Sequence, residues 1–200
     1  MARLSEKTAG TLIALTAVLV ISPDALLISA VSADSWTLVF WRGLLTAMTL
    51  TVSLITIHGR QALTQSLGIG APGLLVGTFF AARTISFVMS VRITTAANTL
   101  VIIAAMPLFA AILTKIFLRE RVPPRTWVAV VSGFGGIAVI FAGSIAGGNP
   151  EGDALALLTA VLMASNFVII RSRRRVNMLP AVILSGIMTT VITAFLGDPL

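Results

Sequence analysis

The chain has 200 residues, of which 57% are hydrophobic and 10% are charged, and its formal net charge at pH 7 is +7. It contains no cysteine and one histidine, which excludes disulfides, thiolate chemistry and metal sites built from cysteine or from several histidines. The positive charge does not indicate a nucleic-acid surface, because nearly all charged residues lie in short gaps between long apolar runs. Such an alternation is typical of a membrane protein.

Seven apolar runs follow one another along the chain. A helix needs about 20 residues to cross the ~30 Å hydrocarbon core of a bilayer, and a backbone inside lipid must satisfy its own hydrogen bonds. The runs cover residues 9–31, 36–57, 70–91, 95–117, 126–145, 154–170 and 180–196. The sequence therefore predicts an all-α, polytopic protein with seven transmembrane helices in contact with the lipid bilayer.

The basic residues are distributed unequally over the gaps. If the N-terminus is cytoplasmic, the cytoplasmic segments hold Arg3, Lys7, Arg60, Lys115, Arg119, Arg121, Arg125, Arg171, Arg173, Arg174 and Arg175. The outside segments then hold Arg92 together with Asp34, Glu151, Asp153 and Asp198. Lys and Arg in short loops stay on the cytoplasmic side. The pattern predicts a multi-pass protein of the inner (plasma) membrane, with its N-terminus cytoplasmic and the C-terminus of this chain outside.

Three charged residues lie well inside the apolar runs: Asp24, Arg42 and Arg83, one in each of the first three. With a rise of 1.5 Å per residue, each lies ~9–12 Å from the outer end of its helix. A charge at the membrane centre costs about 2.5–3.5 kcal/mol, so we expect the three to share one interior. Asp24 can neutralise only one of the two arginines, so one positive charge remains to bind a substrate carboxylate or phosphate. Asp24 itself would form an ion pair or accept a proton. The alternative is an ion cluster that only packs helices, with Arg42 reaching the outer interface.

Polar residues on neighbouring helices are further candidates for the substrate or coupling path. They are Ser86 (on one face with Phe79, Arg83 and Ser90), Asn98 (beside Thr94 and Thr95) and Asn166 (in a stripe with Thr159 and Met163). Asn98 and Asn166 either line a cavity or join helices, since buried amides often do the latter in membranes. Pro107 removes a backbone hydrogen bond at the centre of the fourth helix and predicts a kink. The carbonyl that it frees either lines a cavity or only permits packing.

The chain contains an internal repeat with an offset of 143 residues. The sequence LTAVL occurs at Leu15–Leu19 and again at Leu158–Leu162. Without a gap, the same offset pairs Ser22 with Ser165, Gly43 with Gly186 and Thr46 with Thr189. The sixth and seventh helices thus repeat the first two, and an odd unit of five helices inserts its second copy upside down. The predicted domains are a complete first repeat, residues 1–148, and a partial second repeat, residues 149–200.

Four segments resemble the EamA family of the drug/metabolite transporter superfamily. They are Trp36–Gly43, the fourth helix from Thr95 to Phe109 with its central proline, Phe117–Arg121, and the glycine-rich stretch Trp127–Gly136. The resemblance implies ten helices in an inverted pair of five-helix repeats, and export of small metabolites, often amino acids or their derivatives. This chain departs from that pattern because it lacks the last three helices.

The expected function is a secondary transporter, or permease, that exports small metabolites such as amino acids or their derivatives, with proton coupling through Asp24 as one option. The chain lacks a GxxxxGK[ST] motif and a second carboxylate at bilayer depth, so it is not expected to be an enzyme or to use a cofactor or metal. The expected partners are a small-molecule substrate and either a second copy or a chain that supplies the missing half, and no nucleic acid. The alternatives are an inactive or partner-dependent fragment of such a transporter, and a membrane assembly protein.

Overall fold

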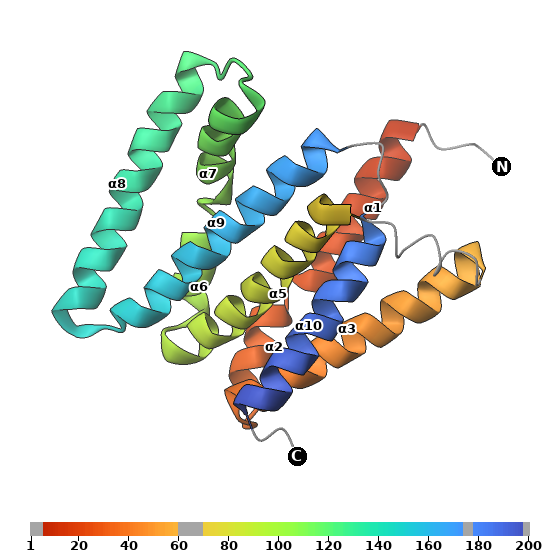
Figure 1. Cartoon of the computed structure of the whole chain (residues 1–200). Coiled ribbons are helices and arrows are strands. Elements are labelled where there is room, and N and C mark those ends of the chain that lie inside the picture. The colour runs from red at the N-terminus through yellow and green to blue at the C-terminus, as the bar shows by residue number, and fades with distance from the viewer. Residues whose placement is uncertain (1–5, 60–69, 174–177, 198–200) are drawn as a thin grey trace.

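The computed structural model describes residues 6–59, 70–173 and 178–197, and this part of the chain is helical without a strand (Figure 1). The elements are α1 (Glu6–Ile21), α2 (Asp24–Ala30), α3 (Ser35–His58), α5 (Gly70–Ile93), α6 (Ala96–Ile103), α7 (Met106–Leu113), the π-helical turn η1 (Thr114–Leu118), α8 (Pro124–Gly147), α9 (Pro150–Ser172) and α10 (Leu179–Leu196). Five of the charges used for the orientation lie outside the described residues: Arg3, Arg60, Arg174, Arg175 and Asp198.

Within the described residues, seven helical segments are long and apolar enough to cross a membrane. The first consists of α1 and α2 together, and the fourth of α6, α7 and η1. The predicted all-α polytopic fold is therefore confirmed. Large apolar residues are exposed on each of these spans, as expected for side chains that face lipid rather than water.

The sixth span begins earlier than its hydropathy suggests. Helix α9 starts at Pro150 rather than at Ala154, so Glu151 and Asp153 belong to its first turn. Proline is favoured as the first residue of a helix because it lacks the N–H that would be left unbonded. Acidic side chains are favoured there because the helix N-terminus carries partial positive charge. The predicted start of the sixth helix at Ala154 was therefore wrong, whereas the outside position of the two carboxylates stays a prediction.

The connection between the first two spans is fixed by two sets of hydrogen bonds. The Asp34 carboxylate caps α3 by accepting a hydrogen bond from the Trp36 N–H at 2.8 Å. At the end of α5, the Arg92 guanidinium donates to the carbonyls of Val31 at 2.8 Å and Ala33 at 2.7 Å. These bonds hold α2 and α3 beside the end of α5.

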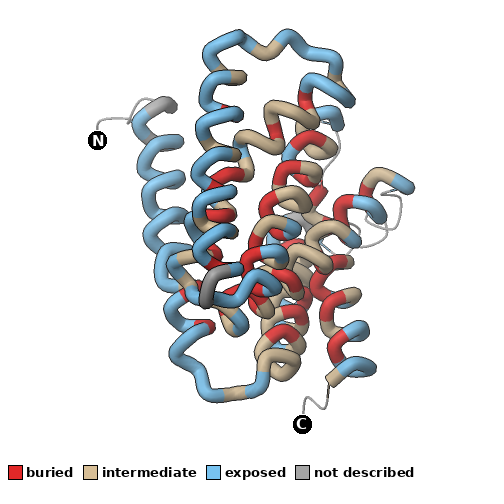
Figure 2. Tube along the Cα trace, turned by 90° about the vertical axis from the view of Figure 1, so that its left-hand side faces the viewer, coloured by how far each residue is buried: buried red, intermediate tan, exposed pale blue. Residues whose placement is uncertain are grey.

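Helix α5 lies at the centre of the bundle, packed against both α9 and α10, and α10 also lies along α3 (Figure 1). Helix α9 contacts α6 and α7, and α8 lies at the edge against α7 and α9. Helix α1 differs from the rest: every residue from 10 to 23 is exposed, and it stands apart from the bundle in Figure 2. The first span is therefore anchored through α2, whose Ala25 and Ile28 pack with residues of α3 and α5.

Helices α3 and α10 cross backbone to backbone at a pair of glycines. A Cβ atom placed on Gly43 would lie 3.0 Å from the Gly186 carbonyl oxygen, and one placed on Gly186 would lie 2.8 Å from the Gly43 carbonyl oxygen. On either side of this point, Gly43 faces Thr190 and Gly186 faces Ala47. Such close approach of small residues is a common way for helices to associate in membranes.

Candidate functional site

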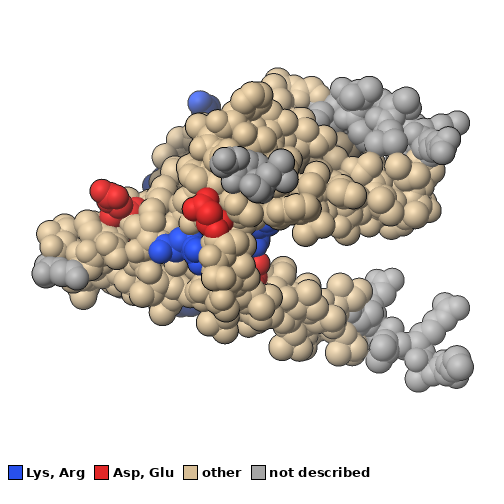
Figure 3. Space-filling view, turned by 90° about the horizontal axis from the view of Figure 1, so that it is seen from below, with Lys and Arg blue, Asp and Glu red and all other residues tan. Residues whose placement is uncertain are grey.

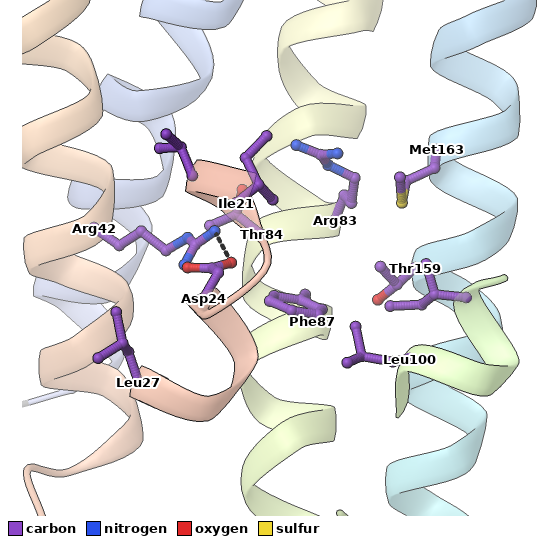
Figure 4. Close-up of a pocket in the computed structure, with 12 residues that line it drawn as sticks. Ile21, Asp24, Leu27, Arg42, Arg83, Thr84, Phe87, Leu100, Thr159 and Met163 are labelled. Atoms are coloured by element: carbon purple, nitrogen blue, oxygen red, sulfur yellow. Dashed lines mark hydrogen bonds and ion pairs between the residues drawn. The ribbon is translucent and has the colours of Figure 1, made fainter. Parts of the chain in front are cut away.

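A cavity of about 520 Å³ lies between the first, second, third, fourth and sixth spans (Figure 4). This volume is within the ~300–1,000 Å³ of typical small-molecule sites. Its apolar wall is formed by Val20, Ile21, Leu27, Phe87, Leu100, Ile103 and Met163, and its polar wall by Asp24, Arg42, Arg83, Thr84 and Thr159. Seen from below, the molecule is hollowed by a notch with charged atoms of both signs at its inner end (Figure 3).

Asp24 and Arg42 form a two-point ion pair in the wall of the cavity. The Nη1 atom of Arg42 donates to Oδ1 of Asp24 at 2.6 Å, and Nη2 donates to Oδ2 at 2.8 Å. Both side chains remain about one-third exposed, at 31% for Asp24 and 36% for Arg42. The guanidinium of Arg42 also lies 5.7 Å from the centre of the Phe87 ring. The pair therefore neutralises both charges while leaving them accessible from the cavity.

Arg83 is the third charge of the cavity and is not neutralised in the same way. Its guanidinium lies 4.6 Å from the centre of the Phe80 ring, and in the part of the chain that the structure describes it has no ion pair and no hydrogen bond. Figure 4 places its side chain above the Asp24–Arg42 pair on the neighbouring helix α5. With the ion pair closed, the lining of the cavity carries one net positive charge.

Two broken helices meet at this cavity. The first span breaks at Ser22–Pro23, between Ile21 and Asp24, and the fourth breaks at Ala104–Ala105, directly after Ile103. Pro107 is the second residue of α7 and has no N–H to donate to the carbonyl of Ile103 four residues earlier. Interrupted helices are tolerated at membrane depth where they line a cavity. In many transporters they form the substrate site.

The structure brings together only part of the candidate set. Asp24, Arg42 and Arg83 line one cavity, but Ser86 does not: it is buried elsewhere on α5, and Thr84 and Phe87 occupy the cavity face of that helix. The expected stripe through Arg83, Ser86 and Ser90 is thus not the face that meets the cavity. The three-charge cluster was found because charges inside apolar runs are rare, whereas hydroxyls can lie on any face.

The two asparagine candidates also lie away from the cavity lining. Asn98 is at the start of α6, where its N–H donates to Thr95 Oγ1 at 3.1 Å and its Nδ2 donates to Thr94 Oγ1 at 3.4 Å. Asn166 is 3% exposed, and both its Oδ1 and Nδ2 atoms are buried without a hydrogen-bond partner among the described residues. Thr159 and Met163, from the same helix as Asn166, do line the cavity.

A second polar group, which the sequence did not reveal, lies where α5 and α8 end and α9 begins. Asp153 is fully buried, and its Oδ2 accepts a hydrogen bond from Ser144. Nearby in sequence, the Gly152 carbonyl accepts a hydrogen bond from Ser90, which also bonds with Thr99. Asp24 is therefore not the only carboxylate within the spans. The signal that could have revealed Asp153 is Pro150, which marks an earlier start of α9.

Comparison with known proteins identifies the family. The model of the EamA-like transporter family matches residues 8–142, more than half of the chain, so the protein belongs to that family. The match includes the ion pair, Arg83 and both broken helices. No curated protein and no solved structure matches the chain.

Proposed function

Starting from membership of the EamA-like transporter family, we propose that the cavity is the substrate site of a secondary transporter for small organic anions or zwitterions, such as amino acids or their derivatives. The family and the membrane-helical fold indicate a transporter rather than an enzyme. The observation that carries the proposal is Arg83, a cation in a largely apolar cavity beside an ion pair that is already closed.

The chemistry of the lining defines the class of substrate. Arg83 offers planar N–H donors that match a carboxylate or phosphate, and the apolar wall receives an aliphatic or aromatic portion. A cavity of about 520 Å³ has the size of typical small-molecule sites rather than of a site for a peptide chain. The bound anion would replace the solvation that Arg83 loses inside the membrane, which makes binding favourable without breaking the Asp24–Arg42 pair.

The predicted inverted repeat favours alternating access as the mechanism. Gly43 and Gly186 are related by the offset of 143 residues and touch each other. Gly43 contacts Thr190, and Gly186 contacts Ala47. Because Thr190 lies 143 residues after Ala47, the two contacts join the same two repeat positions with the copies exchanged. A reciprocal contact of this kind is the mark of a two-fold relation. In transporters with inverted repeats, the substrate site lies at the interface of the repeats, and here α9 of the second repeat lines the cavity.

We infer that transport is outward across the inner membrane and exchanges protons through Asp24. Among the residues that line the cavity, Asp24 is the one carboxylate. Deprotonated Asp24 can accept a hydrogen bond from the ammonium group of an amino-acid substrate, and protonation of Asp24 from the outside would remove that charge. Proton and substrate would then bind in alternation, which links inward movement of protons to outward movement of substrate.

The test is uptake of a labelled amino-acid panel by proteoliposomes that contain an excess of the same unlabelled amino acids. Arg83→Gln should lower the affinity for a carboxylate substrate roughly 10–150-fold, because a hydrogen-bonded charge contributes about 1.5–3 kcal/mol. Arg173→Gln, which removes an exposed charge outside the cavity, is the matched control. Unchanged transport by Arg83→Gln would overturn the proposed site.

One alternative is favoured by the exposure of α1. A cavity wall with a bare helix from residue 10 to residue 23 would be completed by a partner, either a second copy or another chain. Proteoliposomes prepared at several protein-to-lipid ratios distinguish a single working chain from an assembly of two. A transport rate that rises with the square of the ratio requires two chains, and a linear rise does not.

A further inference from the structure

A second groove lies on the other side of the α6–α7 break from the substrate cavity, between α7, α9 and the loop that follows η1. Its volume is about 540 Å³. Its inner part is apolar, formed by Met106, Pro107, Ala110, Ala111 and Phe167. Its rim carries Arg121 and Arg171 together with Glu120. The groove therefore combines an apolar trough with a charged opening.

The rim is positively charged after its internal pairing. Arg171 Nη2 donates to Glu120 Oε2 at 2.5 Å, which accounts for the one acidic side chain of the groove. The Nε atom of Arg171 is buried and has no partner among the described residues. Arg121 makes no ion pair in this part of the chain. On the other side of the same loop, Lys115 and Arg119 line a neighbouring cavity that also includes Arg121.

The position of the groove coincides with the end of two membrane spans. The fourth span ends at Leu118 and the sixth at Ser172, so the charged rim lies where lipid headgroups lie. From Thr114 at the rim to Met106 inside, the chain rises ~12 Å along the helix axis. Two alanines on this stretch leave the trough open along α7.

We propose that this groove binds an anionic glycerophospholipid, with its phosphate at Arg121 and the exposed part of the Arg171 guanidinium, and one acyl chain along Ala110, Ala111 and Phe167. Basic pockets between helices at a membrane surface recognise such headgroups. A soluble phosphate would use the rim but leave the apolar trough exposed to solvent. A zwitterionic lipid such as phosphatidylcholine would fill the trough, but its quaternary ammonium would lie against the basic rim. The anionic lipid satisfies both parts of the groove.

The lipid would act on the break between α6 and α7. Pro107 lines the groove and Ile103 lines the substrate cavity, and only the break at Ala104–Ala105 separates them. A chain packed against α7 therefore stabilises one arrangement of the broken helix. The groove itself does not depend on the identity of the transported substrate.

The experiment measures the thermal stability of the purified full chain in detergent with added phosphatidylglycerol, phosphatidylcholine or inorganic phosphate. At about 100 times its Kd, phosphatidylglycerol should raise the melting temperature by about 5–10 °C, and the other two additives should not. Arg121→Gln and Ala111→Leu should each abolish most of the shift, the first at the rim and the second in the trough. Arg173→Gln, an equal loss of charge outside the groove, should keep it.

Two outcomes overturn the proposal. An equal shift in all variants would mean unspecific attraction to a basic surface, and an equal shift with inorganic phosphate would mean a soluble-anion site. If Arg121→Gln does not fold, native mass spectrometry of the unmodified chain replaces it. Retention of one phosphatidylglycerol in preference to phosphatidylcholine supports the site, and equal retention of the two contradicts it.

Discussion

The ion pair of Asp24 and Arg42 joins α2 to α3 through two charge-assisted hydrogen bonds. Each charge would be costly alone at this depth of a membrane. Removing one partner leaves the other unpaired, which costs more than the pair itself contributes. The pair therefore stabilises the packing of the first span as well as shaping the cavity.

We expect Asp24→Asn to destabilise the protein by about 1–3 kcal/mol, because Arg42 loses a charged acceptor. For a chain of this size, that corresponds to a fall of about 2–10 °C in melting temperature. The double variant Asp24→Asn/Arg42→Gln should recover part of the loss, since no unpaired charge then remains. Size-exclusion chromatography after heating in detergent measures both. Strictly additive losses would show that the two side chains do not stabilise each other.

At the level of single residues, the sequence predicted the charges of the site better than its neutral polar groups. Asp24, Arg42 and Arg83 come together because a charged side chain is unfavourable in contact with lipid. A charge within an apolar run can be recognised from the sequence alone. Ser86, Asn98 and Asn166 carry no such requirement, since hydroxyls and amides are also accommodated between helices. The buried Asp153 was missed because hydropathy set the start of α9 too late.

The interrupted spans are the elements that give the protein its cavity. Pro23 lies in the first break, and Pro107 lies just after the second, at the start of α7. The sequence indicated the second interruption through Pro107, because proline cannot continue a helix hydrogen-bond ladder. It could not indicate that both breaks line the same cavity, since that depends on contacts between helices distant in the chain.

The crossing of α3 with α10 is a close contact between two backbones, and it gives a direct test. Gly186→Ala should destabilise the protein by about 1–3 kcal/mol, because the new Cβ would lie 2.8 Å from the Gly43 carbonyl oxygen and 2.9 Å from the Ala47 backbone nitrogen. Gly136→Ala in α8 is the matched control, with no atom within 4 Å of its Cβ. Measurement of the folded fraction after extraction compares them. Equal stability of the two variants would contradict the close crossing.

For the whole molecule, the loop charges predict the orientation. Alkaline phosphatase is active only after export from the cytoplasm, so a fusion after Gly197 should be active and one within residues 120–123 inactive. The opposite pattern would reverse the orientation, and with it the side of the membrane on which the charged rim of the lipid groove lies. A fusion after Arg92, at the end of α5, should be active and serves as an internal control.

The number and order of the spans could be predicted from the sequence, whereas their neighbours could not. Seven apolar runs are enough to give seven helices, because lipid leaves the backbone no other choice. That α5 lies between α9 and α10, and that α1 lies apart, depends on contacts between small residues across the bundle. The apolar residues that identify a membrane span do not show which other span it packs against, because lipid-facing and helix-facing positions are both apolar.

The packing of α10 on α3 also has a consequence for synthesis in the cell. Gly43 is made 143 residues before Gly186, which at 5–20 residues per second is a delay of roughly 7–30 s. During that time α3 lies in the bilayer with its glycine face against lipid. The face of α5 that later packs against α9 is exposed to lipid as well. The early spans must therefore be stable as single inserted helices, and the bundle closes only when the late ones leave the ribosome. A pause in translation before α9 would prolong this open state and expose the chain to membrane proteases.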